Sequence, residues 1–144
     1  GSLKITPHSA QLKKDGNLIF KADPYVVIHF GHQKHQTQPC KKGGKTPIWD
    51  ETVVFDRFDE DILVLQLWDK DRLSKDDYIC QGTLDVKDLL KPGVQTLTVD
   101  LYHRGEFMGK MTIEFEFSEL PHTLKNDMSQ PSNPDAFLSG NRFQ

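Results

Sequence analysis

Two groups of aspartates in this 144-residue chain have the types and spacing to bind a metal ion. The first group is Asp15 and Asp23, and the second is Asp69, Asp71, Asp76 and Asp77. Carboxylates held together in a partly desolvated crevice repel one another, and a divalent cation relieves that repulsion. Calcium suits such an all-oxygen set because it accepts about six to eight ligands in loose geometry. The two groups therefore predict a calcium site if the fold brings them together.

Turn chemistry is the plainer explanation for any single one of these aspartates, because Asp is a favoured turn residue. Two groups in two connections are harder to explain as turns alone. The helical calcium-binding loop does not fit, because counting from Asp69 places Ser74 where that loop requires Gly and Cys80 where it requires Glu. A calcium site in this chain must therefore be built from loops that join strands.

Alternating apolar and polar residues, rich in β-branched and aromatic types, run from residue 3 to residue 117. We predict eight strands, at residues 3–12, 25–30, 33–38, 49–56, 62–68, 79–84, 96–101 and 109–117. The only helical candidate is a short turn at residues 86–90, which Pro92 and Gly93 end. This pattern predicts an all-β fold, an eight-stranded antiparallel Greek-key β-sandwich. Connections two strands apart then emerge at the same end, so the two acidic groups can meet.

The composition divides the chain into three parts. Gly1 and Ser2 are typical of an expression scar, and residues 3–120 form the predicted sandwich. Residues 121–144 carry prolines among Ser, Asn and Asp without hydrophobic periodicity, which predicts a flexible C-terminal tail. The isolated apolar residues of that tail either bind another protein or simply lie across the sandwich.

Three motifs in the predicted sandwich carry a family resemblance. They are Asp23-Pro24-Tyr25-Val26 at the start of a strand, Pro47-Ile48-Trp49-Asp50-Glu51 before another, and the segment from Trp68 to Asp77 followed by Gly82. In this order and spacing they resemble the C2 domain family of conventional protein kinase C and synaptotagmin, over about residues 3–117. The resemblance implies an eight-stranded sandwich that binds calcium between its end loops and then docks on anionic phospholipid.

The resemblance also implies which residues bind the ion. The ligands are Asp23 from the first loop, before the strand at residues 25–30, and Asp69, Asp71 and Asp77 from the third loop, after the strand at residues 62–68. The Ser74 side chain and the Lys70 carbonyl are lesser donors. The first loop departs from the family pattern, because Asn17 stands where an Asp is usual, and Asp15 is a possible replacement. We expect about two calcium ions. The strand that begins at Gly109 resembles the first strand of synaptotagmin-like domains, which implies the circularly permuted type II topology.

Apolar and basic residues in the same loops fit contact with a membrane. Three adjacent apolar residues lie between Asp15 and Asp23, and a second apolar tip lies in the third loop. The predicted membrane-contact residues are Leu18, Ile19, Phe20, Arg72 and Leu73, with Lys41, Lys42 and Lys45 from the second loop. Each Lys near an anionic leaflet contributes about 1 kcal/mol. A solubilising turn explains the lysines equally well, and Ile19 also fits an inward-facing strand end.

Other partners are disfavoured by composition. The chain has 18 basic and 21 acidic residues, and this net charge of −3 argues against nucleic acid as the partner. Its apolar runs are far shorter than the roughly 20 residues that cross a bilayer, and we recognise no secretory signal.

Cys40 and Cys80 are expected to be reduced thiols. His29, His32 and His35 with Cys40 lack the paired spacing of a zinc site.

No catalytic arrangement is recognised, because the chain has no nucleophile elbow and no phosphate cradle. We therefore predict a non-enzymatic, monomeric, cytoplasmic protein that binds Ca²⁺ and becomes a peripheral membrane protein on anionic phospholipids. The main alternative is a calcium-independent protein-interaction module that retains the acidic loops and acts through its tail. A weaker alternative is an enzyme that uses the metal crevice for phosphodiester chemistry.

Overall fold

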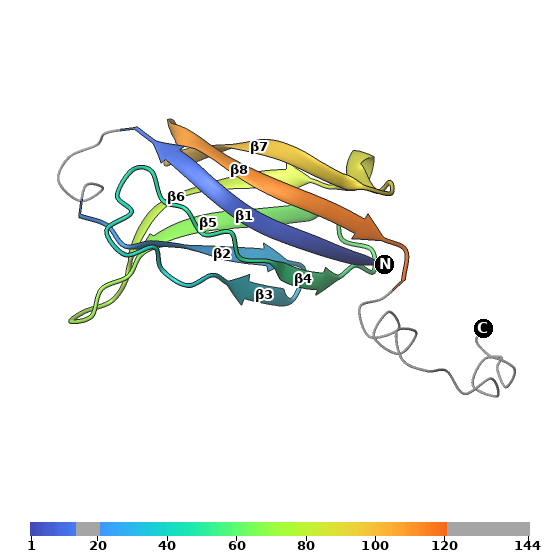
Figure 1. The fold of residues 1–144 in the computed structure, drawn as a ribbon, viewed down its shortest axis with the longest axis horizontal. Coiled ribbons are helices and arrows are strands. Elements are labelled where there is room, and N and C mark those ends of the chain that lie inside the picture. The colour runs from blue at the N-terminus through green and yellow to red at the C-terminus, as the bar shows by residue number, and fades with distance from the viewer. Residues whose placement is uncertain (14–20, 121–144) are drawn as a thin grey trace, which may run out of the picture.

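A computed structural model describes residues 1–13 and 21–120 of the protein. Five residues of the predicted first loop, namely Asp15, Asn17, Leu18, Ile19 and Phe20, lie outside the described residues, as does the predicted tail. The strands are β1 (Ser2–Leu12), β2 (Pro24–Phe30), β3 (Gln33–Gln36), β4 (Val53–Asp56), β5 (Ile62–Asp69), β6 (Asp77–Asp85), β7 (Val94–His103) and β8 (Glu106–Ser118). The predicted turn is a 3₁₀ helix, η1 (Lys87–Leu89). The all-β, eight-stranded prediction is confirmed (Figure 1).

The bounds of β4, β7 and β8 differ from the prediction for local reasons. β4 begins at Val53 instead of at residue 49, because Asp50 has a positive φ of 51°, which interrupts an extended backbone. β7 and β8 run further than predicted, to a tight turn at Arg104 and Gly105. Both turn residues have positive φ, 49° and 84°, which matches the twist of the flanking strands in a two-residue hairpin.

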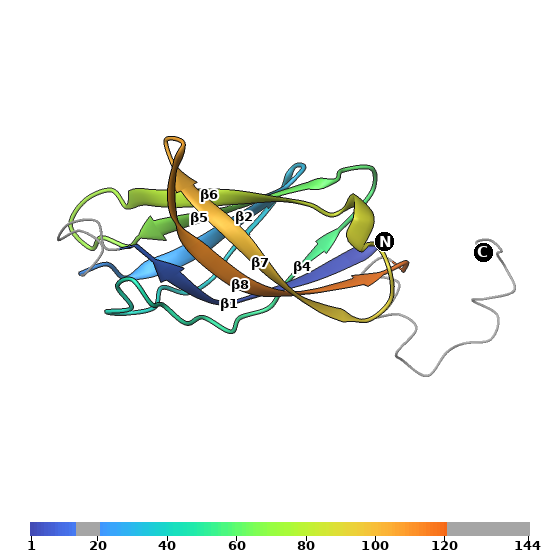
Figure 2. The same ribbon diagram turned by 90° about the horizontal axis from the view of Figure 1, so that it is seen from above.

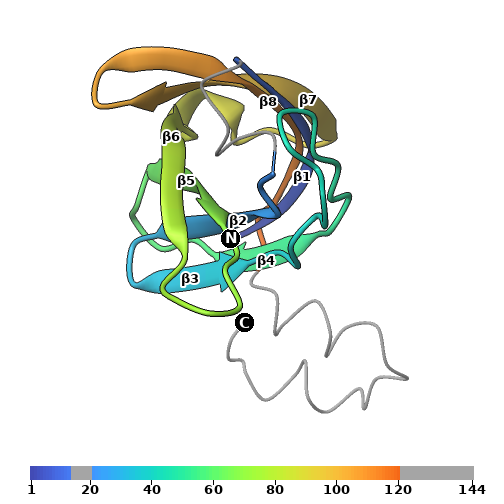
Figure 3. The same cartoon turned by 90° about the vertical axis from the view of Figure 1, so that its left-hand side faces the viewer.

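The strands follow the order β3-β2-β5-β6-β7-β8-β1-β4, with antiparallel pairing throughout. The end-on view in Figure 3 shows two facing layers, one of β3, β2, β5 and β6 and one of β7, β8, β1 and β4. β6 and β7 pair through a single residue pair, Gln81 and Tyr102. The layers are therefore held together mainly by side chains in the space between them.

The core fills this space by simple alternation along the strands. In β8, Met111, Ile113 and Phe115 are fully buried, whereas Glu114 and Glu116 point outward. Leu3 and Ile5 of β1 are fully buried against them, and leucines of β5 cover the core from the other layer. Burying a side chain of this size contributes about 1.5–3 kcal/mol. In the described residues, no helix is long and apolar enough to cross a membrane.

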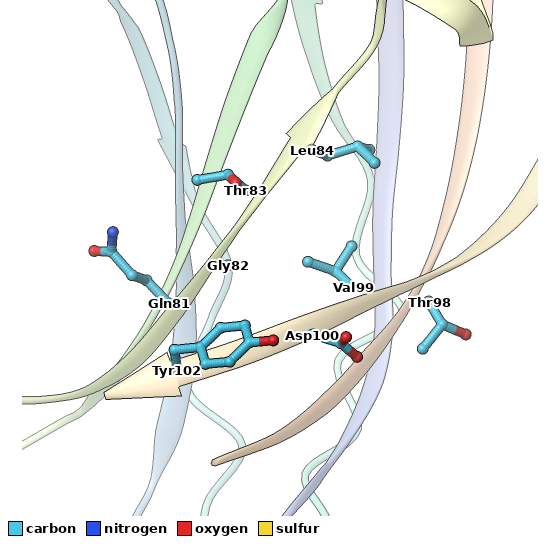
Figure 4. A pocket seen from close by; sticks show the side chains of 8 residues that line it. All are labelled: Gln81, Gly82, Thr83, Leu84, Thr98, Val99, Asp100 and Tyr102. Carbon is cyan, nitrogen blue, oxygen red and sulfur yellow. The ribbon is translucent and has the colours of Figure 1, made fainter. Parts of the chain in front are cut away.

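A shallow cavity of about 430 Å³ opens where β6 and β7 diverge from their single pair. Figure 4 shows side chains from both strands around it, with the ring of Tyr102 on one side and Leu84 on the other. Gly82 lies at its base, where a Cβ atom would collide with the carbonyl oxygen of Asp100 and lie 2.7 Å from Cγ1 of Val99. Only glycine lets the two strands approach this closely.

Four connections emerge at one end of the sandwich because the strands alternate in direction. We name residues 13–23 loop 1, residues 37–52 loop 2 and residues 70–76 loop 3; the fourth connection is the turn at Arg104 and Gly105. The other connections lie at the opposite end, together with residue 1 and the C-terminal end of β8 (Figure 1).

Candidate functional site

Asp23 is the residue at which the three loops meet. Its backbone N–H donates a 2.9 Å hydrogen bond to Oδ1 of Asp69, at the end of β5. Its own Oδ1 accepts a 2.7 Å hydrogen bond from the backbone N–H of Lys42 in loop 2, and its carbonyl accepts one from the N–H of Lys70 in loop 3. These contacts place Asp23 of the first acidic group at the same end as Asp69 of the second, as the sequence predicts, whereas Asp15 lies outside the described residues.

Asp69 lies among several other carboxylates. It is half-buried, it pairs with Asp77 across β5 and β6, and Asp23 and Asp71 are also near. Burial first, and then the negative charges of these three aspartates, raise the pKa of Asp69, although the N–H of Asp23 opposes the shift. Negative charge is therefore concentrated where the loops meet.

Loop 3 is organised by its own side chains. The carboxylate of Asp71 accepts a 2.9 Å hydrogen bond from the N–H of Leu73 and a 2.7 Å hydrogen bond from the hydroxyl of Ser74. These donors, the Leu73 N–H first, lower the pKa of Asp71. The tip of the loop projects into solvent, with Leu73 98% exposed and Arg72 exposed beside it. The predicted exposed apolar tip is thus present in loop 3.

Asp76 belongs to the second acidic group in the sequence, but its carboxylate accepts hydrogen bonds from other protein groups. Its Oδ2 accepts a 2.5 Å hydrogen bond from the hydroxyl of Tyr25, and its Oδ1 accepts one of 2.9 Å from the N–H of Asp71. The ammonium group of Lys70 lies 3.8 Å away. The Asp71 N–H first, then Tyr25, lower the pKa of Asp76. Asp76 therefore positions loop 3 by bracing it against β2.

Tyr25 was not recognised as a site residue from the sequence, although it belongs to the Asp-Pro-Tyr motif. It is 8% exposed, and burial together with the Asp76 carboxylate raises its pKa to about 12. The neighbouring carbonyl of Pro24 accepts two further hydrogen bonds, from Nε1–H of Trp49 and from the N–H of Cys40, both 2.8 Å long. All three sequence motifs thus converge on residues 23–25.

Loop 2 carries its lysines to the same end, as predicted. Lys41, Lys42 and Lys45 are all exposed. Their backbone is attached on both sides, because the N–H of Gly44 donates to Ala22 and the carbonyl of Lys45 accepts from the N–H of Leu12. The position of these lysines is therefore set by the end of β1 and by Ala22 in loop 1.

The remaining candidate metal ligands do not assemble. Among residues 1–13 and 21–120, no three His, Cys, Asp or Glu side chains form a group that could hold a metal ion. His29 is hydrogen-bonded to Gln66 on the sheet face, and the ring of His35 packs against Phe55. Cys40 and Cys80 are free thiols, and burial raises the pKa of Cys80 to about 12. The predicted calcium ligands Asp23, Asp69, Asp71 and Asp77 are therefore near one another without forming such a group. The predicted donors of loop 1, Asp15 and Asn17, lie outside the described residues.

Comparison with known proteins gives a consistent result. The family model described as "C2 domain" matches residues 1–101. The "16 kDa phloem protein 1" of Arabidopsis thaliana is 32% identical over 107 residues, which are 70% of this chain and 69% of that protein. The solved structure of a "C2 domain-containing protein from putative elicitor-responsive gene" has a TM-score of 0.72 at 23% identity, and the match covers 92% and 93% of the two chains. A structure of two C2 domains of extended synaptotagmin 2, described as "calcium bound", has a TM-score of 0.60 at 26% identity, covering 81% of this chain and 45% of that one.

Proposed function

Because the chain belongs to the C2 domain family, we propose that it is a calcium-dependent module that docks on anionic phospholipid through loops 1–3. The single observation that carries this proposal is the meeting of all three loops at Asp23, beside the half-buried Asp69. We assign residues 3–120 to the module.

The donor chemistry fits a hard cation. Asp23, Asp69, Asp71 and Asp77 offer carboxylate oxygens, and the Ser74 hydroxyl and the Lys70 carbonyl are further oxygen donors. Bound calcium would supply positive charge and open coordination positions for a lipid phosphate. The raised pKa of Asp69 supports the assignment, because burial first, and then three neighbouring carboxylates, raise it where the loops meet. The calcium-bound state of a structural relative supports it as well. We propose about two ions, with Asp15 or Asn17 completing the set.

Apolar and basic side chains of the same loops would contact the membrane directly. Leu73 is almost completely exposed at the tip of loop 3, where its burial in the headgroup region would remove apolar surface from water. Lys41, Lys42 and Lys45 lie in the adjacent loop 2 and attract an anionic surface. We extend the contact to Arg72 and to Leu18, Ile19 and Phe20. We propose a non-enzymatic, monomeric, cytoplasmic protein that moves to the membrane surface.

Calorimetric calcium titration and co-sedimentation with phosphatidylserine vesicles test the proposal. We expect saturable heat and calcium-dependent sedimentation for the wild type, and neither for the double variant Asp69→Asn with Asp71→Asn. The matched control is Asp59→Asn with Asp88→Asn, which removes two exposed carboxylates at the opposite end. Undiminished sedimentation of the loop variant would contradict the proposal. No saturable heat at up to about millimolar calcium would instead favour the calcium-independent interaction module.

A further inference from the structure

The turn between β7 and β8 brings a fourth element to the end of the sandwich that carries loops 1–3. Tyr102 pairs with Phe107 and His103 with Glu106, so the strands continue to the two-residue turn. Figure 2 shows this hairpin projecting sideways from the body of the sandwich. The N–H of Lys13 donates a 2.7 Å hydrogen bond to the carbonyl of Met108, which attaches the hairpin to the beginning of loop 1. The hairpin is therefore well defined and adjoins the candidate site.

Two large aromatic side chains remain exposed on this hairpin. Tyr102 is 43% exposed and Phe107 38% exposed, and their ring centroids lie 5.9 Å apart in an edge-to-face arrangement. Elsewhere in β8 the large apolar residues Met111, Ile113 and Phe115 are fully buried. Adjacent exposed rings on a strand that otherwise buries its apolar residues are typical of a contact surface.

Cations surround the aromatic pair. The ammonium groups of Lys13 and Lys110 lie 5.7 Å and 5.5 Å from the centroid of the Phe107 ring. We name Lys13, Tyr102, Arg104, Phe107 and Lys110 the hairpin patch. Exposed acidic residues nearby are Asp100, which is ion-paired with Lys110 at 2.8 Å, and Glu106. Counted over the described residues, and with both acidic residues included, the patch region has a charge of +1 from three cations and two anions.

We propose that the hairpin patch is a second contact with the anionic phospholipid surface, which tilts the sandwich toward the β7–β8 side. Aromatic rings favour the interface between headgroups and acyl chains, and flexible basic side chains extend from such rings toward phosphates. Because the hairpin projects sideways, it reaches the surface together with loop 3 only when the sandwich is tilted. This inference rests on the proposed membrane function but needs no metal ligand from the hairpin, so its contribution is independent of calcium and sensitive to salt.

The electrostatic test compares charge-neutralising variants at the two ends. We expect Lys13→Gln with Arg104→Gln to bind phosphatidylserine-containing vesicles about 25-fold more weakly, because each cation near an anionic leaflet strengthens binding about fivefold. The matched control is Lys87→Gln with Lys91→Gln, two exposed lysines at the opposite end, which should bind like the wild type. Equal binding by the two double variants would overturn the inference.

The aromatic part is tested by Phe107→Ala, with Phe107→Tyr as the conservative variant. We expect weaker vesicle binding for alanine and near-complete retention for tyrosine, with the thermal unfolding midpoint confirming that each variant is folded. The two failures are distinguishable. If the wild type does not bind vesicles with calcium, the proposed function itself fails. If the wild type binds and the hairpin variants bind equally well, as a patch for a protein partner would, only the hairpin inference fails.

Discussion

The hydroxyl of Tyr25 donates a hydrogen bond to the carboxylate of Asp76, which lies 51 positions later in the chain. The same carboxylate accepts the N–H of Asp71, so one side chain links the start of β2 to the interior of loop 3. Asp76 thereby fixes the position of loop 3 relative to β2. Both of its carboxylate oxygens already accept hydrogen bonds, from Tyr25 and from Asp71. Tyr25 and Asp76 set the geometry in which the neighbouring carboxylates are presented.

Tyr25→Phe should lower the free energy of unfolding by about 1.5 kcal/mol, because it removes a hydrogen bond to a partly buried charged group. Urea denaturation measures the loss. Tyr102→Phe is the matched control, since the structure shows no hydrogen bond to the hydroxyl of Tyr102 from any described residue, and it should cost little. The lowered pKa of Asp76 adds a pH dependence: its contribution is present above the ordinary value of 3.8 and is lost as the pH falls through the lower folded-state pKa. Equal losses of unfolding free energy for Tyr25→Phe and Tyr102→Phe would show that the hydrogen bond from Tyr25 to Asp76 does not stabilise loop 3.

Asp69→Asn should stabilise the calcium-free protein at pH 7, by under about 1 kcal/mol because solvent screens a half-exposed group. Asparagine retains an oxygen for the N–H of Asp23 and removes the repulsion among the carboxylates. The folded-state pKa of Asp69 is raised, so the wild type loses stability as the pH rises from the ordinary value of 3.8 through that higher pKa. Thermal unfolding should therefore show a gain at pH 7 that disappears under strongly acidic conditions. A lower thermal unfolding midpoint for Asp69→Asn than for the wild type at pH 7 would contradict repulsion among the carboxylates.

Trp49→Phe should loosen loop 2, because it removes the Nε1–H that donates to the carbonyl of Pro24. The expected cost is about 1 kcal/mol, and hydrogen exchange across residues 40–45 should become faster. Trp68→Phe is the control: its Nε1–H donates to the side chain of Gln66 on the sheet face, so its loss should leave exchange in loop 2 unchanged. Equal exchange in the two variants would show that Trp49 does not attach the loop.

Gly109→Ala should destabilise the protein by more than about 2 kcal/mol. Gly109 has a φ of +147°, and a Cβ atom there would collide with the carbonyl oxygen of Gln11 and lie 2.9 Å from Cα of Leu12. Gly105→Ala separates backbone strain from crowding, because Gly105 also has a positive φ but no described atom within 4 Å of an added Cβ. Its expected cost is about 1–2 kcal/mol. Chemical denaturation of both variants should give the larger loss at Gly109.

Several strands were predictable because apolar and polar residues alternate along them, as in β8, where Met111, Ile113 and Phe115 are buried. The start of β4 was not, because the positive φ of Asp50 depends on its surroundings and not on its hydropathy. The proximity of Asp23 and Asp69 could be predicted, because antiparallel strands place connections two strands apart at the same end of the sandwich. The role of Asp76 could not, since the sequence cannot show which of several adjacent carboxylates meets a phenol from another strand.

The close approach at Gly82 also bears on self-association. The side of β7 that faces β6 pairs with it only at Tyr102 within the described residues, and such an open strand edge is a template for pairing with a second molecule. The backbone of β6 at Gly82 occupies the space beside Asp100 and Val99, so an incoming strand cannot extend along the whole edge. We therefore expect Gly82, which lets β6 lie against β7, to limit self-association along this edge.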